Sequence, residues 1–332
     1  CNRSSPNAGR IMALLDMDKL DRFRGCLLGG AAGDALGMPT EGYTAGEIQS
    51  IFGRMVDMMP PPVGHFHAGL RAGQFTDDTE ETLLLAESLI EHSGFSADGF
   101  SSKLASWGSS WCLNERLWSG VGFATRSAIM SMIAGTPWQE SGISIPTCGS
   151  AMRAAPIGLL YHSDLDLVRS YADLQSLPTH SAPASRAGAV AVAVGVALCL
   201  IDLPKETILE SAARQAGRVD RELAERLIWV QSLLDLPPEE ARGRIRTSPL
   251  SKETVVSAFY CFLRFRPEEG LIAAASGGGD TDSIASIAGN LFGAAYGTRW
   301  IPQRWLVSLE QKERIEGIAK ELFHLCESCC PQ

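Results

Sequence analysis

The stretch DRFRGCLLGGAAGDALG, residues 21–37, sets four glycines at a spacing of four, at positions 25, 29, 33 and 37. Residues four apart lie on one face of an α-helix, so these glycines form a stripe along the predicted helix. Glycine inside a helix costs about 1 kcal/mol relative to alanine, so the stripe makes sense only where another backbone, or a ligand, approaches closely. The dinucleotide fingerprint G-x-G-x-x-G fails here, because Leu28 stands where that pattern needs glycine.

The rest of the chain also has the patterns of helices, interrupted by loops at 38–44 and 58–74 that are rich in proline and glycine. Further helices are predicted over 76–92, 100–135, 150–162, 164–175, 184–201, 206–218, 220–234, 238–246, 252–266, 282–296 and 309–328. No alternating β-branched run stands between turn signals, and no fixed-period repeat or long linker interrupts the chain. We therefore predict an all-α protein with a single compact multi-helix domain over residues 20–328. Residues 1–19, polar and irregular at first, are expected to form a flexible arm outside the core.

The length, composition and net charge of the chain exclude some classes of function. The 332 residues can bury a sizeable core, and 45% hydrophobic with 20% charged residues is ordinary for a soluble globular protein. A formal net charge of -9 argues against a nucleic-acid partner held by phosphate neutralisation. The longest apolar run, residues 187–201, is shorter than the ~20 residues that cross a bilayer, so it predicts a buried central helix and no membrane association. Scattered cysteines within apolar runs, such as Cys26, Cys199 and Cys261, favour buried thiols in a reducing compartment, and we expect a cytoplasmic protein.

Two acidic clusters stand far apart in the sequence, in GQFTDDTEETLLLAESLI (73–90) and ASGGGDTDSIASIAGN (275–290). Both fall at predicted helix starts, where free backbone N–H groups and the helix dipole favour negative charge. Each cluster could therefore be a helix cap and nothing more. One capping side chain suffices for that purpose, however, and each cluster supplies two carboxylates and a hydroxyl neighbour.

A metal site is the alternative to double capping. The oxygen-bearing side chains of the two clusters are Thr76, Asp77, Asp78, Asp280, Asp282 and Ser283. Brought together, they form an all-oxygen shell with four negative charges, which suits Mg²⁺ or Mn²⁺ and can serve two adjacent ions. No histidine or cysteine is at hand in either cluster to favour zinc.

Several motifs together resemble the ADP-ribosylglycohydrolase family from about residue 20 to 300. They occur in the family's order: RFRGCLLGGAAGDALGMPTEG (22–42), GQFTDDTEETLLLAESL (73–89), CGSAMRAAPIGLLY (148–161), LPTHSAPA (177–184) and GGGDTDSIASIAGNLFGAAYG (277–297). The resemblance implies an all-α fold with a dinuclear magnesium centre in a cleft. It also implies hydrolysis of the bond that joins the anomeric ribose carbon of ADP-ribose to a modified side chain.

The resemblance assigns roles to individual positions. All six oxygen-bearing residues of the two clusters become metal ligands, and Asp78 and Asp282 are also counted as catalytic. Glu41 matches an acidic residue beside the metals, with a general acid/base or water-positioning role, although a solvated loop carboxylate is the plain alternative. Asp34 also matches, and a buried packing carboxylate is at least as good an interpretation for it. Substrate contacts are expected from Gly122, Thr125, Gly149, Ser150, His180, Gly278 and Gly279.

Two positions depart from many relatives. Cys148-Gly149-Ser150 stands where they have G-N-G, and Gly120 stands where some have aspartate. Both departures bear on fine substrate preference. The two histidines of GHFHAG (64–69) have no assigned role, and we expect a mobile surface loop there.

The favoured function is Mg²⁺-dependent hydrolysis of the N-glycosidic bond between ADP-ribose and a modified protein side chain, most plausibly arginine, with Mn²⁺ as an alternative ion. O-linked substrates, on serine or as O-acetyl-ADP-ribose, remain open. From a different class, an immunity or binding module could block an ADP-ribosylating toxin through the N-terminal arm. Every ligand position is filled, which favours the enzyme.

Overall fold

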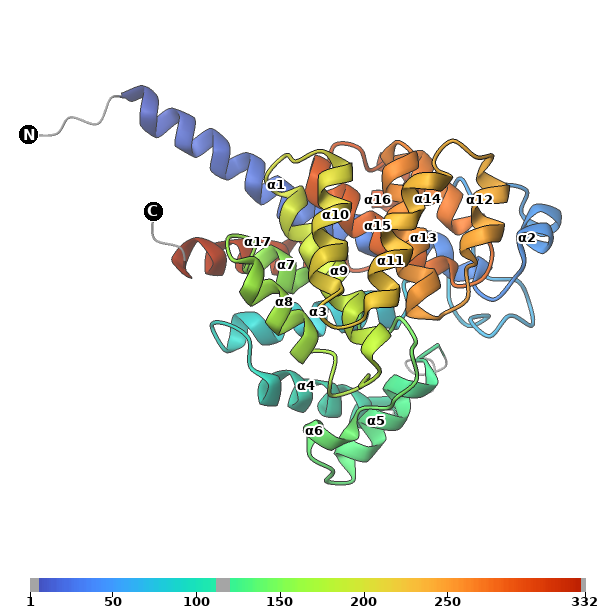
Figure 1. The fold of residues 1–332 in the computed structure, drawn as a ribbon, viewed down its shortest axis with the longest axis horizontal. Helices are drawn as coiled ribbons and strands as arrows, with labels where there is room; N and C mark the ends of the chain where they lie inside the picture. Colours follow the sequence, from blue (N-terminus) through green and yellow to red (C-terminus); the bar gives the residue numbers. More distant parts are fainter. Residues whose placement is uncertain (1–5, 112–119, 330–332) are drawn as a thin grey trace, which may run out of the picture.

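The computed structural model describes residues 6–111 and 120–329, and its named elements are all helices (Figure 1). The α-helices are α1 (Pro6–Gly37), α2 (Ala45–Ile51), α3 (Asp77–Glu91), α4 (Ala97–Ser110), α5 (Phe123–Ile133), α6 (Trp138–Ser141), α7 (Ala155–Leu160), α8 (Leu165–Leu174), α9 (Pro183–Cys199), α10 (Lys205–Ala216), α11 (Arg221–Trp229), α12 (Pro238–Ile245), α13 (Ser251–Arg264), α14 (Pro267–Ala275), α15 (Thr281–Tyr296), α16 (Gln303–Ser308) and α17 (Lys312–Cys329). Two 3-10 helices are η1 (Met38–Thr40) and η4 (Val230–Leu233). Within the described ranges, extended residues pair only as isolated bridges, such as that between Thr44 and Gly278. The prediction of an all-α fold is confirmed.

The helix boundaries agree with the sequence patterns except at a few places. The single helix predicted over 100–135 is wrong, because α4 ends at Ser110 and α5 begins only at Phe123. Residues 112–119 lie outside the described part of the chain. Helices α2, α6, α14 and α16 were not predicted. A capping box of Thr44 and Glu47 precedes α2 and was an available signal, whereas α16 has six residues and shows little periodicity.

The glycine stripe of α1 packs against α15 through backbone contact. A Cβ atom added at Gly29 would lie 2.4 Å from the carbonyl oxygen of Gly289, and one added at Gly33 would lie 2.1 Å from that of Ala285. The contact is mutual, because a Cβ at Gly293 would lie 1.8 Å from the carbonyl oxygen of Gly25. The close neighbour predicted for the glycine stripe is therefore the backbone of another helix. This contact fixes the position of α1 relative to α15.

This interface carries the end of α1 to the start of α15. A Cβ at Gly37 would lie 2.4 Å from the carbonyl oxygen of Thr281. The Thr281 hydroxyl donates to the carbonyl of Gly37 at 2.9 Å, and the Thr40 hydroxyl donates to the carbonyl of Ala275 at 2.7 Å. Glu41, the residue after η1, is thereby brought beside the acidic motif at the start of α15.

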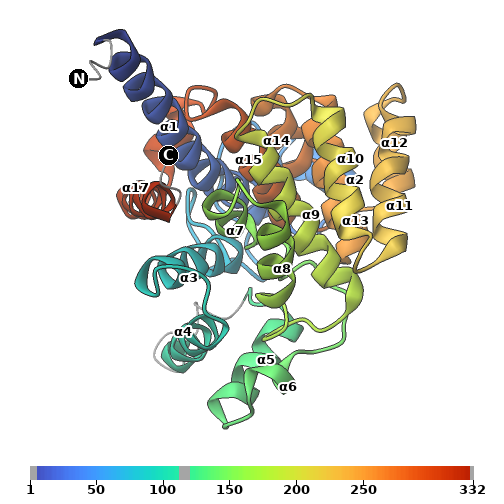
Figure 2. The ribbon, with the colours of Figure 1, turned by 60° about the vertical axis from the view of Figure 1, so that its left-hand side comes forward.

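Helix α9 lies in the core, as predicted for residues 187–201. Its residues from Ala187 to Cys199 are all buried, and α7, α8, α10, α13 and α15 pack around it. Figure 2 shows α3 to α6 on one side of the molecule and α9 to α13 on the other. No helix in the described ranges is both long enough and apolar enough to cross a membrane.

Buried thiols and the N-terminal helix complete the outline. Cys26, Cys199 and Cys261 are buried free thiols, as predicted. Helix α1 begins at Pro6, so part of the segment expected as an arm is helical, and this end of α1 extends away from the body (Figure 1). A separate role for residues 1–19 stays a prediction.

Candidate functional site: a carboxylate-lined cavity

The two acidic motifs meet in one cavity of about 320 Å³. It lies at the N-terminal ends of α3 and α15, where both motifs had been expected to begin helices. Its acidic and hydroxyl lining comes from Glu41, Asp77, Asp78, Asp280, Asp282 and Ser283. Five of the six predicted metal ligands therefore meet here, whereas the sixth, Thr76, lines the neighbouring cavity.

Thr76 caps α3 and is itself held by Asp34. The Thr76 hydroxyl accepts from the backbone N–H of Asp78 at 3.3 Å and donates to Asp34 Oδ1 at 3.0 Å. Asp34, which is fully buried, also accepts from the backbone N–H groups of Thr76 and Thr79 and from the Thr79 hydroxyl. With its oxygens so occupied, Asp34 ties α1 to the start of α3, in agreement with the packing interpretation.

No lysine or arginine stands among the described residues that line the cavity with these carboxylates. Asp78 and Asp282 are only 2% and 4% exposed, and Asp78 Oδ2 has no hydrogen-bond partner among the described residues. Burial raises the pKa of Asp77, Asp78 and Asp282 well above the usual range, and repulsion from neighbouring carboxylates raises it further. A buried carboxylate oxygen without a partner is costly, and a divalent cation would supply the missing charge. The donor set fits such an ion.

Asp280 is the best-satisfied acid of the cluster. Its Oδ2 atom accepts from the Thr254 hydroxyl and from the Cys148 thiol, whose Sγ atom lies 3.1 Å away. Burial raises the pKa of the Cys148 thiol, and Asp280 and Asp78 raise it further, so this sulfur carries its proton. The sequence predicted no cysteine at the site, and that expectation is wrong for Cys148.

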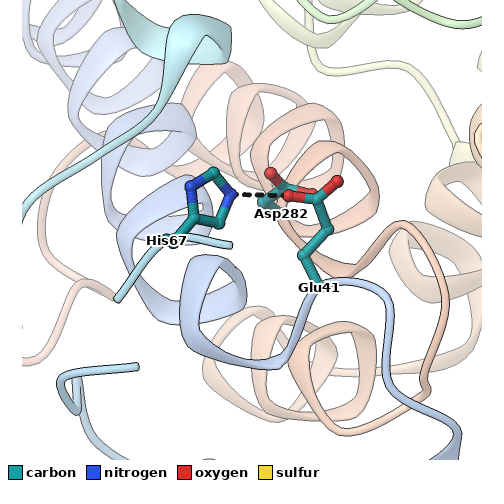
Figure 3. A group of neighbouring side chains, drawn as sticks. All are labelled: Glu41, His67 and Asp282. Atoms are coloured by element: carbon teal, nitrogen blue, oxygen red, sulfur yellow. Dashed lines mark hydrogen bonds and ion pairs between the residues drawn. The ribbon is translucent and has the colours of Figure 1, made fainter. Parts of the chain in front are cut away.

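Glu41 is held by two histidines of the loop 64–69 (Figure 3). His67 Nε2 lies 2.7 Å from Glu41 Oε2, and His65 Nε2 lies 2.8 Å from the backbone oxygen of Glu41. The backbone N–H of His67 donates to His65 Nδ1 at 3.1 Å, so His65 carries its proton on Nε2 and donates it to Glu41. The expectation of an unassigned surface loop is wrong for these two side chains, which are 7% and 2% exposed.

His67 also brings a nitrogen close to the acidic cluster. One ligand atom from each of Glu41, His67 and Asp282 lies within 4.8 Å of the others, an arrangement that could hold a metal ion. The expectation that no histidine is at hand is therefore also wrong. Gly120 makes room for this imidazole, because a Cβ there would lie 2.4 Å from His67 Cε1. The alternating H-x-H spacing was the only local signal, and it does not reveal which carboxylate the loop covers.

The predicted substrate contacts divide into two groups. Gly122, Thr125, Gly149 and His180 line the cavity. His180 is 1% exposed, with Nδ1 2.9 Å from the Thr179 hydroxyl and Nε2 3.1 Å from the Thr147 hydroxyl. Burial lowers the pKa of His180 to about 3, and the charge of Arg153 lowers it as well, so this ring is neutral at physiological pH.

The other three predicted substrate-contact residues do not line the cavity. They are Ser150, Gly278 and Gly279, and they pack against other parts of the protein. The Ser150 hydroxyl donates to the backbone oxygen of Ser185 at 3.2 Å. Gly278 and Gly279 have φ values of 80° and 79°, which glycine adopts without strain. A Cβ at Gly278 would lie 2.6 Å from the backbone nitrogen of Ala45, and one at Gly279 would lie 2.0 Å from the carbonyl oxygen of Thr247. These glycines permit close backbone approach that shapes the loop before Asp280.

Comparisons with known proteins place the chain in a family. The sequence model of the ADP-ribosylglycohydrolase family matches residues 15–332. An uncharacterized protein of Archaeoglobus fulgidus is 39% identical over 92% of this chain and 97% of its own length. ADP-ribosylhydrolase ARH3 of Bos taurus is 28% identical over 92% of this chain and 93% of its own. ADP-ribosylarginine hydrolase Tri1 of Serratia proteamaculans is 29% identical over 93% of this chain and 81% of its own.

The fold comparison leads to the same family. A solved structure described as an ADP-ribosylglycohydrolase-related protein complex superimposes with a TM-score of 0.75 at 29% identity. The superposition covers 93% of this chain and 99% of that one. A match to the family over nearly the whole chain shows that this chain belongs to the ADP-ribosylglycohydrolase family and is a hydrolase of ADP-ribosyl bonds.

Proposed function

We propose that this chain hydrolyses the N-glycosidic bond between ADP-ribose and protein arginine, with two Mg²⁺ ions held by the carboxylate cavity. The carrying observation is the meeting of Glu41, Asp78 and Asp282 with the glycine-lined wall of one cavity. The arginine acceptor is supported by the relative Tri1, whose name specifies ADP-ribosylarginine. The name of ARH3 specifies no acceptor. The experiment below therefore also tests an O-linked substrate.

The proposed ion ligands are the six oxygen-bearing residues of the two motifs. Thr76, although held by Asp34, retains an oxygen lone pair, and Asp78 Oδ2 accepts no hydrogen bond from the residues that the structure describes. Magnesium is preferred to zinc because the donors of the two motifs are all carboxylate and hydroxyl oxygens, and the Cys148 thiol directs its S–H to Asp280. Bound ions would grip the ribose hydroxyls and polarise a water molecule.

The protein's own groups orient the substrate. Backbone groups at Gly122 and Gly149 and the Thr125 hydroxyl would contact the diphosphate and the adjoining ribose, with neutral His180 behind them. The distal ribose would then lie at the carboxylates, with its anomeric carbon near Glu41. In this position Glu41 can accept a proton from the attacking water, and His67 and His65 hold it in place.

In the proposed reaction, the water oxygen forms a bond to the anomeric carbon. The bond from that carbon to the guanidine nitrogen breaks, and its electron pair goes to nitrogen. The proton lost by water passes to Glu41 and then to the leaving guanidine. Free ADP-ribose and unmodified arginine are the products, and neither an oxidant nor a further co-reactant is needed.

The deciding experiment measures free ADP-ribose released from an ADP-ribosylated arginine peptide, with Mg²⁺, with EDTA, and with Asp282→Ala. We expect release that requires the metal, and a loss of at least about 100-fold in the variant, since even groups that orient metal ligands are worth 10–100-fold. Release from a serine-linked peptide alone would keep the site and correct the acceptor. Silence on both substrates, despite bound metal, would favour the toxin-binding alternative.

A further inference from the structure

A second cavity, of about 350 Å³, adjoins the first. Asp77 and Gly120 line both cavities, so the two share a wall. The hydrogen bond between Glu41 and His67 spans this wall, because Glu41 lines the first cavity and His67 lines the second. The two cavities therefore lie on either side of the Glu41–His67 pair.

The second cavity is acidic. Asp77, Glu80 and Glu310 face it, and among its described lining residues only Arg71 carries a full positive charge. Arg314 contacts Glu80 Oε2 at 3.2 Å from outside the lining, but it also binds Glu87 at 2.9 Å. The charge of Arg314 is thus shared, and the cavity keeps a surplus of carboxylates.

Two aromatic side chains line the second cavity beside its carboxylates. Trp107, which is 9% exposed, and Phe75 both contribute to the wall. Flat aromatic rings beside carboxylates suit a guanidinium group, whose planar cation can stack on a ring face while its N–H groups reach the acids.

We propose that this second cavity binds the acceptor side of the substrate, as a guanidinium group carried on a polypeptide, while the first cavity binds ADP-ribose. The proposal rests on the proposed hydrolase function and adds the residues that select the acceptor. Glu310 and Glu80 attract the cation, Trp107 and Phe75 contact its flat face, and the scissile bond lies between the cavities at Glu41. Leaving arginine then departs without passing the bound ADP-ribose.

The test compares Glu310→Gln and Glu310→Lys with Glu313→Gln. Glu313 lies on the same part of the chain, is exposed, and does not line the cavity. For an ADP-ribosylated arginine peptide, we expect KM to rise about five-fold in Glu310→Gln, the size of one exposed charge pair, and further in Glu310→Lys. We expect kcat to stay within about two-fold, and KM for a serine-linked peptide to stay unchanged.

A binding measurement separates failure of the acceptor cavity from failure of the proposed function. Agmatine is titrated by calorimetry into protein saturated with ADP-ribose and Mg²⁺, and we expect weaker binding in Glu310→Lys but not in Glu313→Gln. Equal agmatine binding and equal KM in all variants, with the wild type active on arginine, would overturn the cavity assignment alone. Selective loss of agmatine binding without any arginine hydrolysis would overturn the proposed reaction and keep the cation site. No agmatine binding to the wild type would overturn the cavity assignment.

Discussion

Along Gly25–Gly37, α1 contacts α15 backbone to backbone, whereas at Glu41 and Asp282 the continuation of the same contact opens into a cavity lined with carboxylates. In the first region no atom can be added. In the second, like charges are buried together and Asp78 Oδ2 has no hydrogen-bond partner in the described part of the chain. The packed interface therefore needs no further group to be stable. The cavity, in contrast, needs a cation to offset the repulsion among its carboxylates.

The largest effect should come from breaking the interface. Gly33→Ala places a methyl group 2.1 Å from the carbonyl oxygen of Ala285, so we expect the free energy of unfolding to fall by about 3 kcal/mol. Denaturant unfolding measures it. Gly317→Ala is the control, because Gly317 lies within α17 with open space around its Cβ, and the change should stabilise by about 0.5–1 kcal/mol. Equal changes in the free energy of unfolding for the two variants would contradict a close backbone contact at Gly33.

Completing the cavity should stabilise the fold by a comparable amount. With Mg²⁺ at about 100 times its Kd, we expect about 2.7 kcal/mol of added stability in the wild type. In Asp78→Asn most of that gain should vanish, and in EDTA the variant should be as stable as the wild type or more so, because a repelled buried carboxylate has been neutralised. Thermal unfolding with and without Mg²⁺ measures both. A marked destabilisation of Asp78→Asn in EDTA would contradict a charge-strained cavity.

The wall of the cavity at His180 should respond to acid. Its folded pKa of about 3 lies below the unfolded value near 6.5, so protons bind the unfolded state preferentially between these values. His180 thus contributes stability that is complete above about pH 6.5 and is lost as the pH falls toward 3. From pH 7 to pH 5 we expect this residue to account for a loss of about 2 kcal/mol. The difference in pH dependence between the wild type and His180→Gln checks it, and parallel curves would refute it.

The smallest effect should come from loosening Glu41 while its charge is kept. His67→Leu removes the N–H that reaches Glu41 Oε2, and we expect kcat to fall about ten-fold with little change in KM. Gln can restore a donor, so His67→Gln should recover part of the loss. Gly120→Ala should imitate His67→Leu by displacing the imidazole, and the two changes should not be additive. Additive losses, or no recovery with Gln, would show that His67 acts in another way.

The sequence predicted the two halves of the site better than their surroundings. Thr76 and Asp280 precede helices as expected, because capping and helix-dipole effects act within one turn of the chain. His65, His67 and Cys148 were missed as members of the site. His67 contacts Glu41 from 26 residues away and Cys148 contacts Asp280 from 132 residues away, and no local pattern encodes such contacts.

Most helix positions could be predicted from the sequence. So could the need for a close neighbour along the glycine face of α1, and the side chains that can bind hard cations. These properties depend on residues within a turn or two of one another. Only the tertiary structure decided that α15 is the partner of the glycine stripe, that Glu41 lies beside Asp282, and that Asp78 Oδ2 is buried without a partner. Packing, burial and charge repulsion act through space, so they are settled only when distant segments of the chain come together.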